Sequence, residues 1–183
     1  MTAFHSRQQW DLDAWPEMYA TLKELQAVVF LSPPGIETNM MVFTVASLTA
    51  GCRHCQAHGA YGLDRLGLPL DKIQALWRFE QSDLFDDRER AALRFAVAAG
   101  SSPNSVGPEH HAGIREHFAD EEARTLLGVV SVAAFMNRYN DSLATVTDEE
   151  SSEWAAEHLG PLGWDIGKHV GEVAEQRKGP PGG

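Results

Sequence analysis

Apolar residues recur at helical spacing along most of this chain, and that spacing constrains its fold more than any other feature. Between residues 16 and 30, for example, Met18, Leu22, Leu25, Val28 and Val29 fall at intervals that place them along one face of a helix. No stretch shows the alternation of apolar and polar residues, rich in β-branched side chains, that indicates a strand. The sequence therefore predicts an all-α fold.

Proline and glycine divide the chain into successive helices. Breaks are expected at Pro33-Pro34-Gly35, at Gly51, at Gly67-Leu68-Pro69 and through the Ser-, Pro- and Asn-containing loop 100–107. We expect helices over 16–30, 37–50, 52–66, 71–79 and 86–99, a short one after Pro108, a long one from Asp120 that includes 126–143, and a last one after Asp148 that runs to His158. The helix over 37–50 is apolar almost all round, which predicts a central, buried position.

Aspartates mark the expected starts of three of these helices. Asp71 and Asp120 are predicted N-caps, and Asp86 with Glu89 makes a signal that resembles a capping box. At 183 residues the chain is long enough for one domain with a hydrophobic core and short for two. We expect a single helical domain over 1–183, with a core at about 15–145, a helical extension over 148–175 and a frayed tail over 176–183.

The charge of the chain excludes several classes of partner. The net charge is −11, which argues against binding to nucleic acid or to an anionic membrane surface. The acidic residues are dispersed apart from short clusters such as Asp148-Glu149-Glu150, which we interpret as solvated helix faces. No apolar run approaches the ~20 residues of a membrane span, and the polar N-terminus predicts a cytoplasmic protein without an export signal.

One short window carries most of the chemistry in the sequence. Cys52 and Cys55 are the only cysteines, and His54 and His58 lie between and just after them. On a helix turning about 100° per residue, the four side chains would share one face, with the two histidines one turn apart. Thiolate reactivity depends on the thiol pKa, which an imidazolium or a helix N-terminus lowers. The window therefore predicts a thiol–imidazole site for redox chemistry or metal binding.

Between those two chemistries, redox is favoured. In a reducing cytosol, a Cys-x-x-Cys pair is more often catalytic or metal-binding than a permanent disulfide. Structural zinc usually takes two pairs of ligands from separate parts of a chain, and no second pair exists here. We therefore expect no metal and no bound cofactor at this site.

The run Leu48-Thr49-Ala50-Gly51-Cys52-Arg53-His54-Cys55-Gln56-Ala57-His58 resembles the alkylhydroperoxidase and carboxymuconolactone decarboxylase superfamily, most of all its peroxidase-related, AhpD-like branch. The Asn137-Arg138-Tyr139-Asn140 segment agrees with that resemblance, which covers roughly Trp15 to Leu143 in order. The resemblance implies an all-helical bundle that assembles into trimers, dimers or hexamers. It also implies reduction of alkyl hydroperoxides by the cysteine couple, with electrons returned by an external dithiol donor.

The resemblance also assigns roles within the site. Cys55 would attack the peroxide as a thiolate, and Cys52 would resolve the sulfenic acid to a disulfide. His58 would accept the proton of Cys55, while His54 would tune the site electrostatically. Reasoning from the helix dipole alone points the other way, because Cys52 lies nearer the helix N-terminus and should be the more acidic thiol.

Two positions depart from the family pattern. The best-studied members carry their histidine one residue later, at Gly59, and their proton-relay glutamate falls here on Met40 or Asn39.

Two other functions stay open. The first alternative function is a lyase or isomerase of the carboxymuconolactone decarboxylase type, which needs no cysteine couple. The second is a non-enzymatic redox sensor whose disulfide state alters assembly. The fold alone does not decide between these functions.

Overall fold

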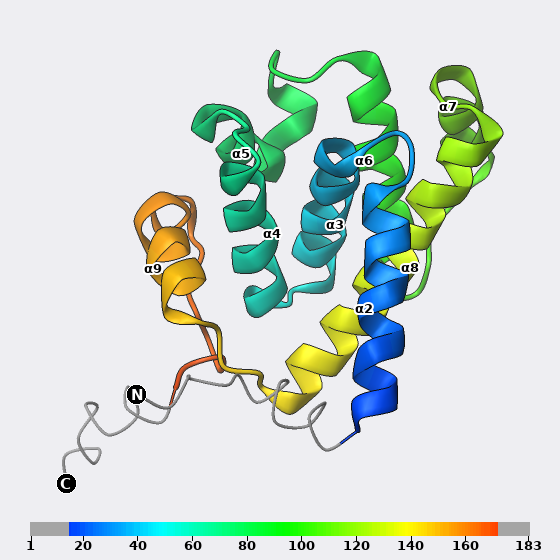
Figure 1. The fold of residues 1–183 in the computed structure, drawn as a ribbon. Coiled ribbons are helices and arrows are strands. Elements are labelled where there is room, and N and C mark those ends of the chain that lie inside the picture. Colours follow the sequence, from blue (N-terminus) through cyan, green and yellow to red (C-terminus); the bar gives the residue numbers. More distant parts are fainter. Residues whose placement is uncertain (1–14, 172–183) are drawn as a thin grey trace, which may run out of the picture.

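The computed structural model describes residues 15–171, and this part of the chain is helical without any strand. The elements are α2 (Pro16–Leu31), α3 (Ile36–Ala50), α4 (Arg53–Arg65), α5 (Leu70–Ala75), the 3₁₀ helix η1 (Leu76–Gln81), α6 (Asp87–Gly100), α7 (Pro108–His117), α8 (Asp120–Leu143), α9 (Glu149–His158) and the 3₁₀ helix η2 (Gly160–Leu162). Figure 1 shows α3 in the middle of the bundle, with α9 on the far side of α4. The all-α prediction is confirmed.

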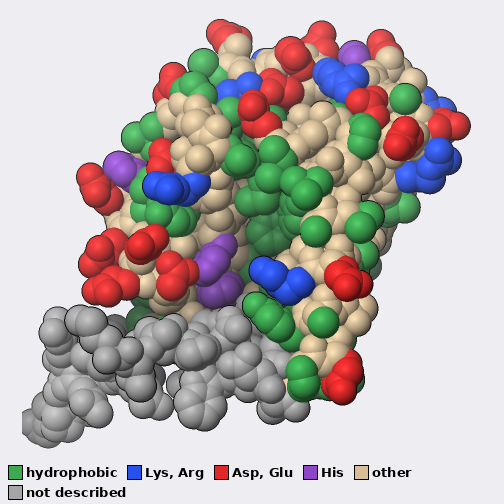
Figure 2. Space-filling view, in the orientation of Figure 1, with side chains coloured by type: hydrophobic (Ala, Val, Ile, Leu, Met, Phe, Trp, Pro, Cys, Tyr) green, Lys and Arg blue, Asp and Glu red, His purple; other side chains and the backbone are tan. Residues whose placement is uncertain are grey.

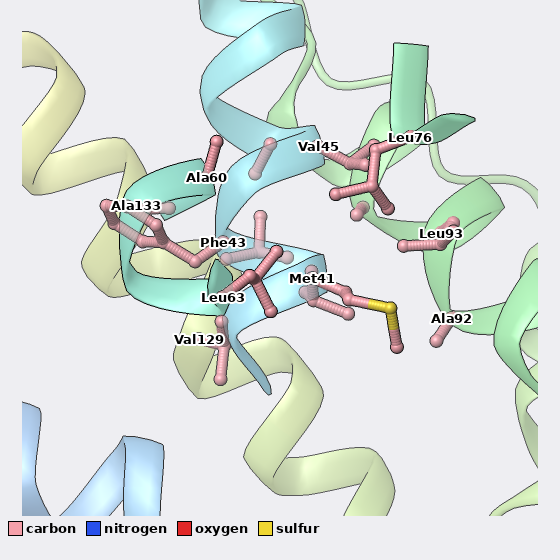
Figure 3. Close-up of a cluster of buried hydrophobic side chains, with 14 of the residues drawn as sticks. Met41, Phe43, Val45, Ala60, Leu63, Leu76, Ala92, Leu93, Val129 and Ala133 are labelled. Carbon is pink, nitrogen blue, oxygen red and sulfur yellow. The ribbon is translucent and has the colours of Figure 1, made fainter. Parts of the chain in front are cut away.

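Helix α3 is the centre of the hydrophobic core, as its apolar sequence predicted. Met41, Val42 and Val45 are each at most 2% exposed, and burying side chains of this size stabilises the fold by about 1.5–3 kcal/mol each. Figure 3 shows Met41 and Val45 of α3 in one cluster with Leu63 of α4, Leu93 of α6 and Val129 of α8. The packing holds the C-terminal end of α3, and so the start of α4, in a fixed place.

Two of the three predicted N-caps are corrected by the structure. The capping box of Asp86 and Glu89 is confirmed, because each side chain accepts a hydrogen bond from the other residue's backbone N–H. Helix α5, however, begins after Pro69, and Asp71 lies in its first turn. Helix α8 begins after Ala119, and Asp120 is its first residue. Acidic side chains are favourable in a first turn because of the helix dipole, so the sequence signal was real but displaced.

The segment after α8 folds back across α4. Ala144 takes the left-handed conformation that ends α8, and residues 145–148 lead into α9, which packs against α4. Acidic side chains gather on the outer surface of α9 (Figure 2). The helical extension expected over 148–175 contains α9 and η2, and residues 163–171 follow as turns and extended chain. The frayed tail expected over 176–183 lies outside the described residues.

By length and composition, no single helix between residues 15 and 171 is suited to crossing a membrane. The pair Pro16–Leu31 and Ile36–Ala50 passes the same test only together, with a bend of 115° between its members.

Candidate functional site

The two cysteines meet at the junction of α3 and α4. Gly51 ends α3 in the left-handed region, at φ 78°, where a residue without Cβ is favoured. Cys52 then serves as the N-cap of α4, and its sulfur accepts a hydrogen bond from the backbone N–H of Cys55 at 3.4 Å. The two sulfur atoms lie 2.9 Å apart, and both cysteines are buried and not joined by a disulfide. The structure therefore brings together the predicted thiol pair as a hydrogen-bonded dithiol.

The two thiols differ in acidity. The pKa of Cys52 is lowered by its hydrogen bond with the Cys55 thiol and by backbone N–H groups at the start of α4, against the opposing effects of burial and of Asp141. The pKa of Cys55 is raised, first by burial and then by the hydrogen bond and charge of Cys52. The hydrogen of the contact between the two sulfurs could lie on either of them. The backbone N–H donors at the start of α4 favour the thiolate at Cys52. Cys55 is then the donor of the shared hydrogen bond.

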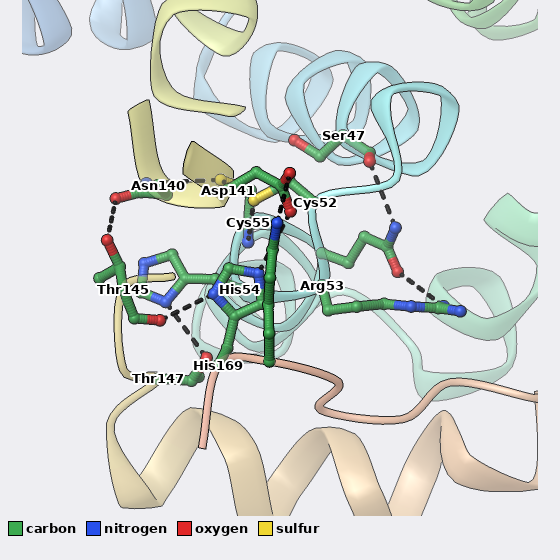
Figure 4. A network of polar contacts seen from close by, with 12 residues as sticks. Ser47, Cys52, Arg53, His54, Cys55, Asn140, Asp141, Thr145, Thr147 and His169 are labelled. Atoms are coloured by element: carbon green, nitrogen blue, oxygen red, sulfur yellow. Dashed lines mark hydrogen bonds and ion pairs between the residues drawn. The ribbon is translucent and has the colours of Figure 1, made fainter. Parts of the chain in front are cut away.

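An asparagine from α8 contacts the sulfur of Cys55. The amide of Asn140 donates to Cys55 Sγ at 3.5 Å, and its carbonyl oxygen accepts from Thr145 Oγ1 at 2.9 Å. Asn140 and Thr145 are buried, and the threonine bond fixes which end of the amide faces the sulfur. The Asn140 contact opposes the rise in the Cys55 pKa, because it stabilises the thiolate form. Figure 4 shows the chain of contacts from Thr145 through Asn140 to the cysteines.

His54 lies beneath the segment that crosses α4. Its Nδ1 is 3.2 Å from Thr147 Oγ1, and its ring is 4.2 Å from the ring of His58 and 5.8 Å from that of His169. His169 is itself buried, and its Nδ1–H donates to the carbonyl oxygen of Thr145 at 2.8 Å. Burial and the two neighbouring imidazoles lower the pKa of His54 to about 2, so this imidazole is neutral at physiological pH.

His58 lies one turn further along α4 and is paired with Asp148. The Nε2 of His58 is 2.7 Å from Asp148 Oδ2, while the other oxygen of Asp148 accepts from the backbone N–H of Ser151 as the N-cap of α9. Burial lowers the pKa of His58, and the Asp148 carboxylate opposes that shift. A neutral His58 donates from Nε2 to the carboxylate, which leaves Nδ1 as a buried acceptor without a partner. Neither sulfur has a direct hydrogen bond to His58 in the described part of the chain.

The two positions that depart from the family pattern have structural roles. A Cβ at Gly59 would lie 2.5 Å from Thr44 Oγ1, so α4 packs directly on α3 there and leaves no room for a histidine. The buried Asn39 donates to the carbonyl oxygens of Phe30 and Ser32 at 3.1 and 2.9 Å, which caps the end of α2. Within residues 15–171, no hydrogen bond joins Asn39 or Met40 to the thiol pair or its histidines, and the position of the family's relay glutamate holds no carboxylate here.

Sequence reasoning missed the residues that the segment after α8 contributes. Asp148 was interpreted as part of a solvated acidic cluster, and the structure corrects this, because Asp148 pairs with His58. Thr145, Thr147 and His169 carried no signal in the sequence. Asn140 lay in the segment that supported the family resemblance, and that was the available hint. These residues come from 85 or more positions away in the chain, as in the contact between Asn140 and Cys55, and no local pattern encodes such pairing.

Residues 15–171 contain no group of three or more His, Cys, Asp or Glu side chains arranged to hold a metal ion. The Cys52–Cys55 dithiol offers redox chemistry of its own. Such a pair can give up two electrons and close to a disulfide.

Comparison with known proteins supports the fold more strongly than any single activity. No protein-family model matches the chain. It is 30% identical to YnjA of Escherichia coli (strain K12) over 73 residues, and so spans 40% of the length of that curated relative. The debrominase Bmp8 superposes with a TM-score of 0.71 at 25% identity, over 76% of this chain and 75% of Bmp8.

Two AhpD-like structures superpose equally well. An AhpD-type protein of Agrobacterium tumefaciens gives a TM-score of 0.70 at 20% identity, over 74% of this chain and 94% of its own. A peroxidase-related protein of Ralstonia eutropha JMP134, with an alkylhydroperoxidase AhpD core, gives a TM-score of 0.69 at 20% identity, over 82% of this chain and 80% of its own. The fold that the cysteine segment suggested is therefore confirmed by structure: this chain has the all-α, AhpD-like fold.

Proposed function

We propose that this protein is a thiol-dependent oxidoreductase that reduces organic hydroperoxides with the Cys52–Cys55 couple. The observation that carries the proposal is the 2.9 Å separation of the two sulfurs at a helix N-cap. In the first step, a thiolate attacks the O–O bond and becomes a sulfenic acid, and the leaving alkoxide takes a proton and departs as the alcohol. In the second step, the other thiol displaces water from the sulfenic acid and the disulfide forms. An external dithiol then reduces the disulfide and is itself oxidised.

We assign the attack to Cys52 and the resolution to Cys55, which reverses the roles that the family resemblance implied. The lowered pKa of Cys52 and the raised pKa of Cys55 support this order, because the thiolate is the nucleophile. His58 remains the proposed base, with Asp148 holding its Nε2 so that Nδ1 is free to accept a proton. No direct hydrogen bond joins His58 to either sulfur. A thiol proton would therefore reach His58 through one water molecule or a substrate oxygen.

The test separates the two cysteines. Cys52→Ser and Cys55→Ser variants are treated with cumene hydroperoxide and then with dimedone, which traps sulfenic acids. We expect the Cys55→Ser protein to accumulate a dimedone adduct at Cys52 and the Cys52→Ser protein to react at least tenfold more slowly. Wild type should lose both thiols per hydroperoxide consumed and turn over with dithiothreitol. An adduct that forms only on Cys55 would restore the roles implied by the resemblance.

Reductive dehalogenation is a second candidate, favoured by one specific comparison. A cysteine-to-alanine variant of the debrominase Bmp8, in complex with 2,3,4-tribromopyrrole, superposes with a TM-score of 0.75 over 80% of this chain. A thiolate would take the halogen as a sulfenyl halide, the ring carbon would take a proton, and the second thiol would expel halide as the disulfide closes. Release of bromide from a bromopyrrole without hydroperoxide turnover would move the assignment there. Disulfide formation without turnover of either substrate would favour a redox sensor.

A further inference from the structure

A polar groove lies near the thiol pair. It has a volume of about 470 Å³ and is bounded by the C-terminal ends of α3 and α6 and by the later turns of α8. Its lining includes Ala50, two residues before Cys52, and Asp141, which follows the Asn140 that contacts Cys55. The charge of Asp141 acts on both thiols. The groove therefore borders the site where the proposed reaction would occur, and its volume falls in the range of small-molecule sites.

The two charged side chains that line the groove differ in whether they are paired. Asp141 is its only acidic side chain, and Lys168 already binds that carboxylate at 2.8 Å. Arg138 is its only basic side chain, and within residues 15–171 it has no ion pair. Three carbonyl groups in the last turn of α6, which would otherwise attract a cation, are already hydrogen-bonded to Ser101, Asn104 and Ser105. One uncompensated guanidinium is left facing the groove.

A buried amide in the same groove also lacks partners. Asn137 is 4% exposed, and its Oδ1 is buried without a hydrogen bond. Its amide nitrogen is less deeply buried than Oδ1 and has no hydrogen-bond partner in the described part of the chain, and the residue lines the groove one position before Arg138. Buried polar groups in proteins are almost always paired. The unpaired N–H donors of this amide and of the neighbouring guanidinium are what a bound ligand with acceptor oxygens would satisfy, whereas the Oδ1 acceptor would need a hydrogen-bond donor.

We propose that this groove binds small organic monoanions, and specifically carboxylates, as substrates of the thiol pair. Arg138 pairs with the carboxylate through two parallel N–H···O bonds, a geometry that guanidinium offers and ammonium does not. Asn137 donates an N–H to the same group, and the reactive end of the molecule extends toward the cysteines. The assignment as a substrate site rests on the proposed function, whereas carboxylate binding does not.

Binding is tested first, in reduced protein, with benzoate as the probe and benzamide as its neutral counterpart. Arg138→Gln removes the guanidinium from an exposed position, and Arg124→Gln is the matched control, since it removes an exposed and unpaired arginine from the same helix. We expect benzoate to bind wild type and the Arg124→Gln protein alike, and at least tenfold more weakly to Arg138→Gln. The side-chain amide signals of Asn137 should shift on titration in nitrogen–proton NMR spectra. Equal binding of benzoate and benzamide, or equal losses in the two variants, would overturn the carboxylate site.

Reaction is tested second, with a short hydroperoxy acid and its methyl ester. We expect the acid to oxidise the thiols faster than the ester, and the ratio of the two rates to fall at least fivefold in Arg138→Gln. Arg138→Lys should recover part of the ratio, because it restores the charge without the paired bonds. If benzoate binds through Arg138 but no hydroperoxide oxidises the thiols, the carboxylate site stands and the proposed peroxidase function fails. If the acid and the ester react alike in all proteins, the groove does not select the substrate.

Discussion

Acidification should destabilise this fold by an amount that the buried histidine beside the cysteines largely determines. His54 has a pKa of about 2 in the folded protein and about 6.5 when the chain is unfolded. Below pH 6.5 the unfolded chain therefore binds a proton that the folded protein refuses. The stability that this group contributes is full above pH 6.5 and is lost as the pH falls from there toward 2. At pH 5 the loss is about 2 kcal/mol, from 1.5 pH units at roughly 1.4 kcal/mol each.

Urea unfolding at pH 7, 6 and 5 measures this loss directly. We expect the wild-type free energy of unfolding to fall by about 2 kcal/mol or more between pH 7 and 5, since the lowered pKa of His58 acts in the same direction. His54→Asn keeps a polar atom near Thr147 and should flatten the dependence by about 2 kcal/mol, although it is less stable at pH 7. His111→Asn, at an exposed position of α7, is the control and should behave as wild type. Parallel curves for wild type and His54→Asn would refute the reasoning.

Three further results are expected. Asp141→Asn should lower the pKa of both thiols, because the carboxylate raises each of them, and alkylation by iodoacetamide near neutral pH should become faster; an unchanged pH profile would contradict this. Asp148→Asn should keep the N-cap of α9, whereas Asp148→Ala should cost about 1 kcal/mol in the free energy of unfolding, and equal losses would show that the cap is unimportant. The chain should self-associate through the apolar face of α2, where Leu25, Val28 and Leu31 are 48–69% exposed, and a monomeric mass by sedimentation would exclude this.

The fold could be predicted from the sequence because the signals that specify helices are local. Apolar spacing and the Gly51 break predicted the helices to within a few residues, and the apolar sequence of α3 predicted the centre of the core. The capping errors at Asp71 and Asp120 were small because an aspartate is favourable both at an N-cap and in the first turn.

Only part of the candidate site could be predicted from the sequence. The proximity of the thiols followed from three-residue spacing at a helix start, and the stacking of His54 on His58 followed from the helical repeat. The partners of those groups could not be predicted, because Thr147 and Asp148 reach α4 only after the chain has turned back at Ala144. The directions of the thiol pKa shifts depend on those long-range neighbours and on burial, which composition does not encode.

The depth of the sulfur pair limits which reductants can recycle it. Disulfide exchange requires the incoming sulfur to approach one of the two sulfurs along the bond between them. Cys52 and Cys55 are at most 2% exposed, and the indole N–H of Trp164, in the segment after η2, donates to the carbonyl oxygen of Arg53 and ties that segment to the start of α4. A folded protein dithiol cannot make that approach unless this segment moves, whereas a compact reductant needs only a narrow opening. Donors of equal reduction potential should thus differ in rate according to their bulk, so that steric access rather than electron affinity selects the donor.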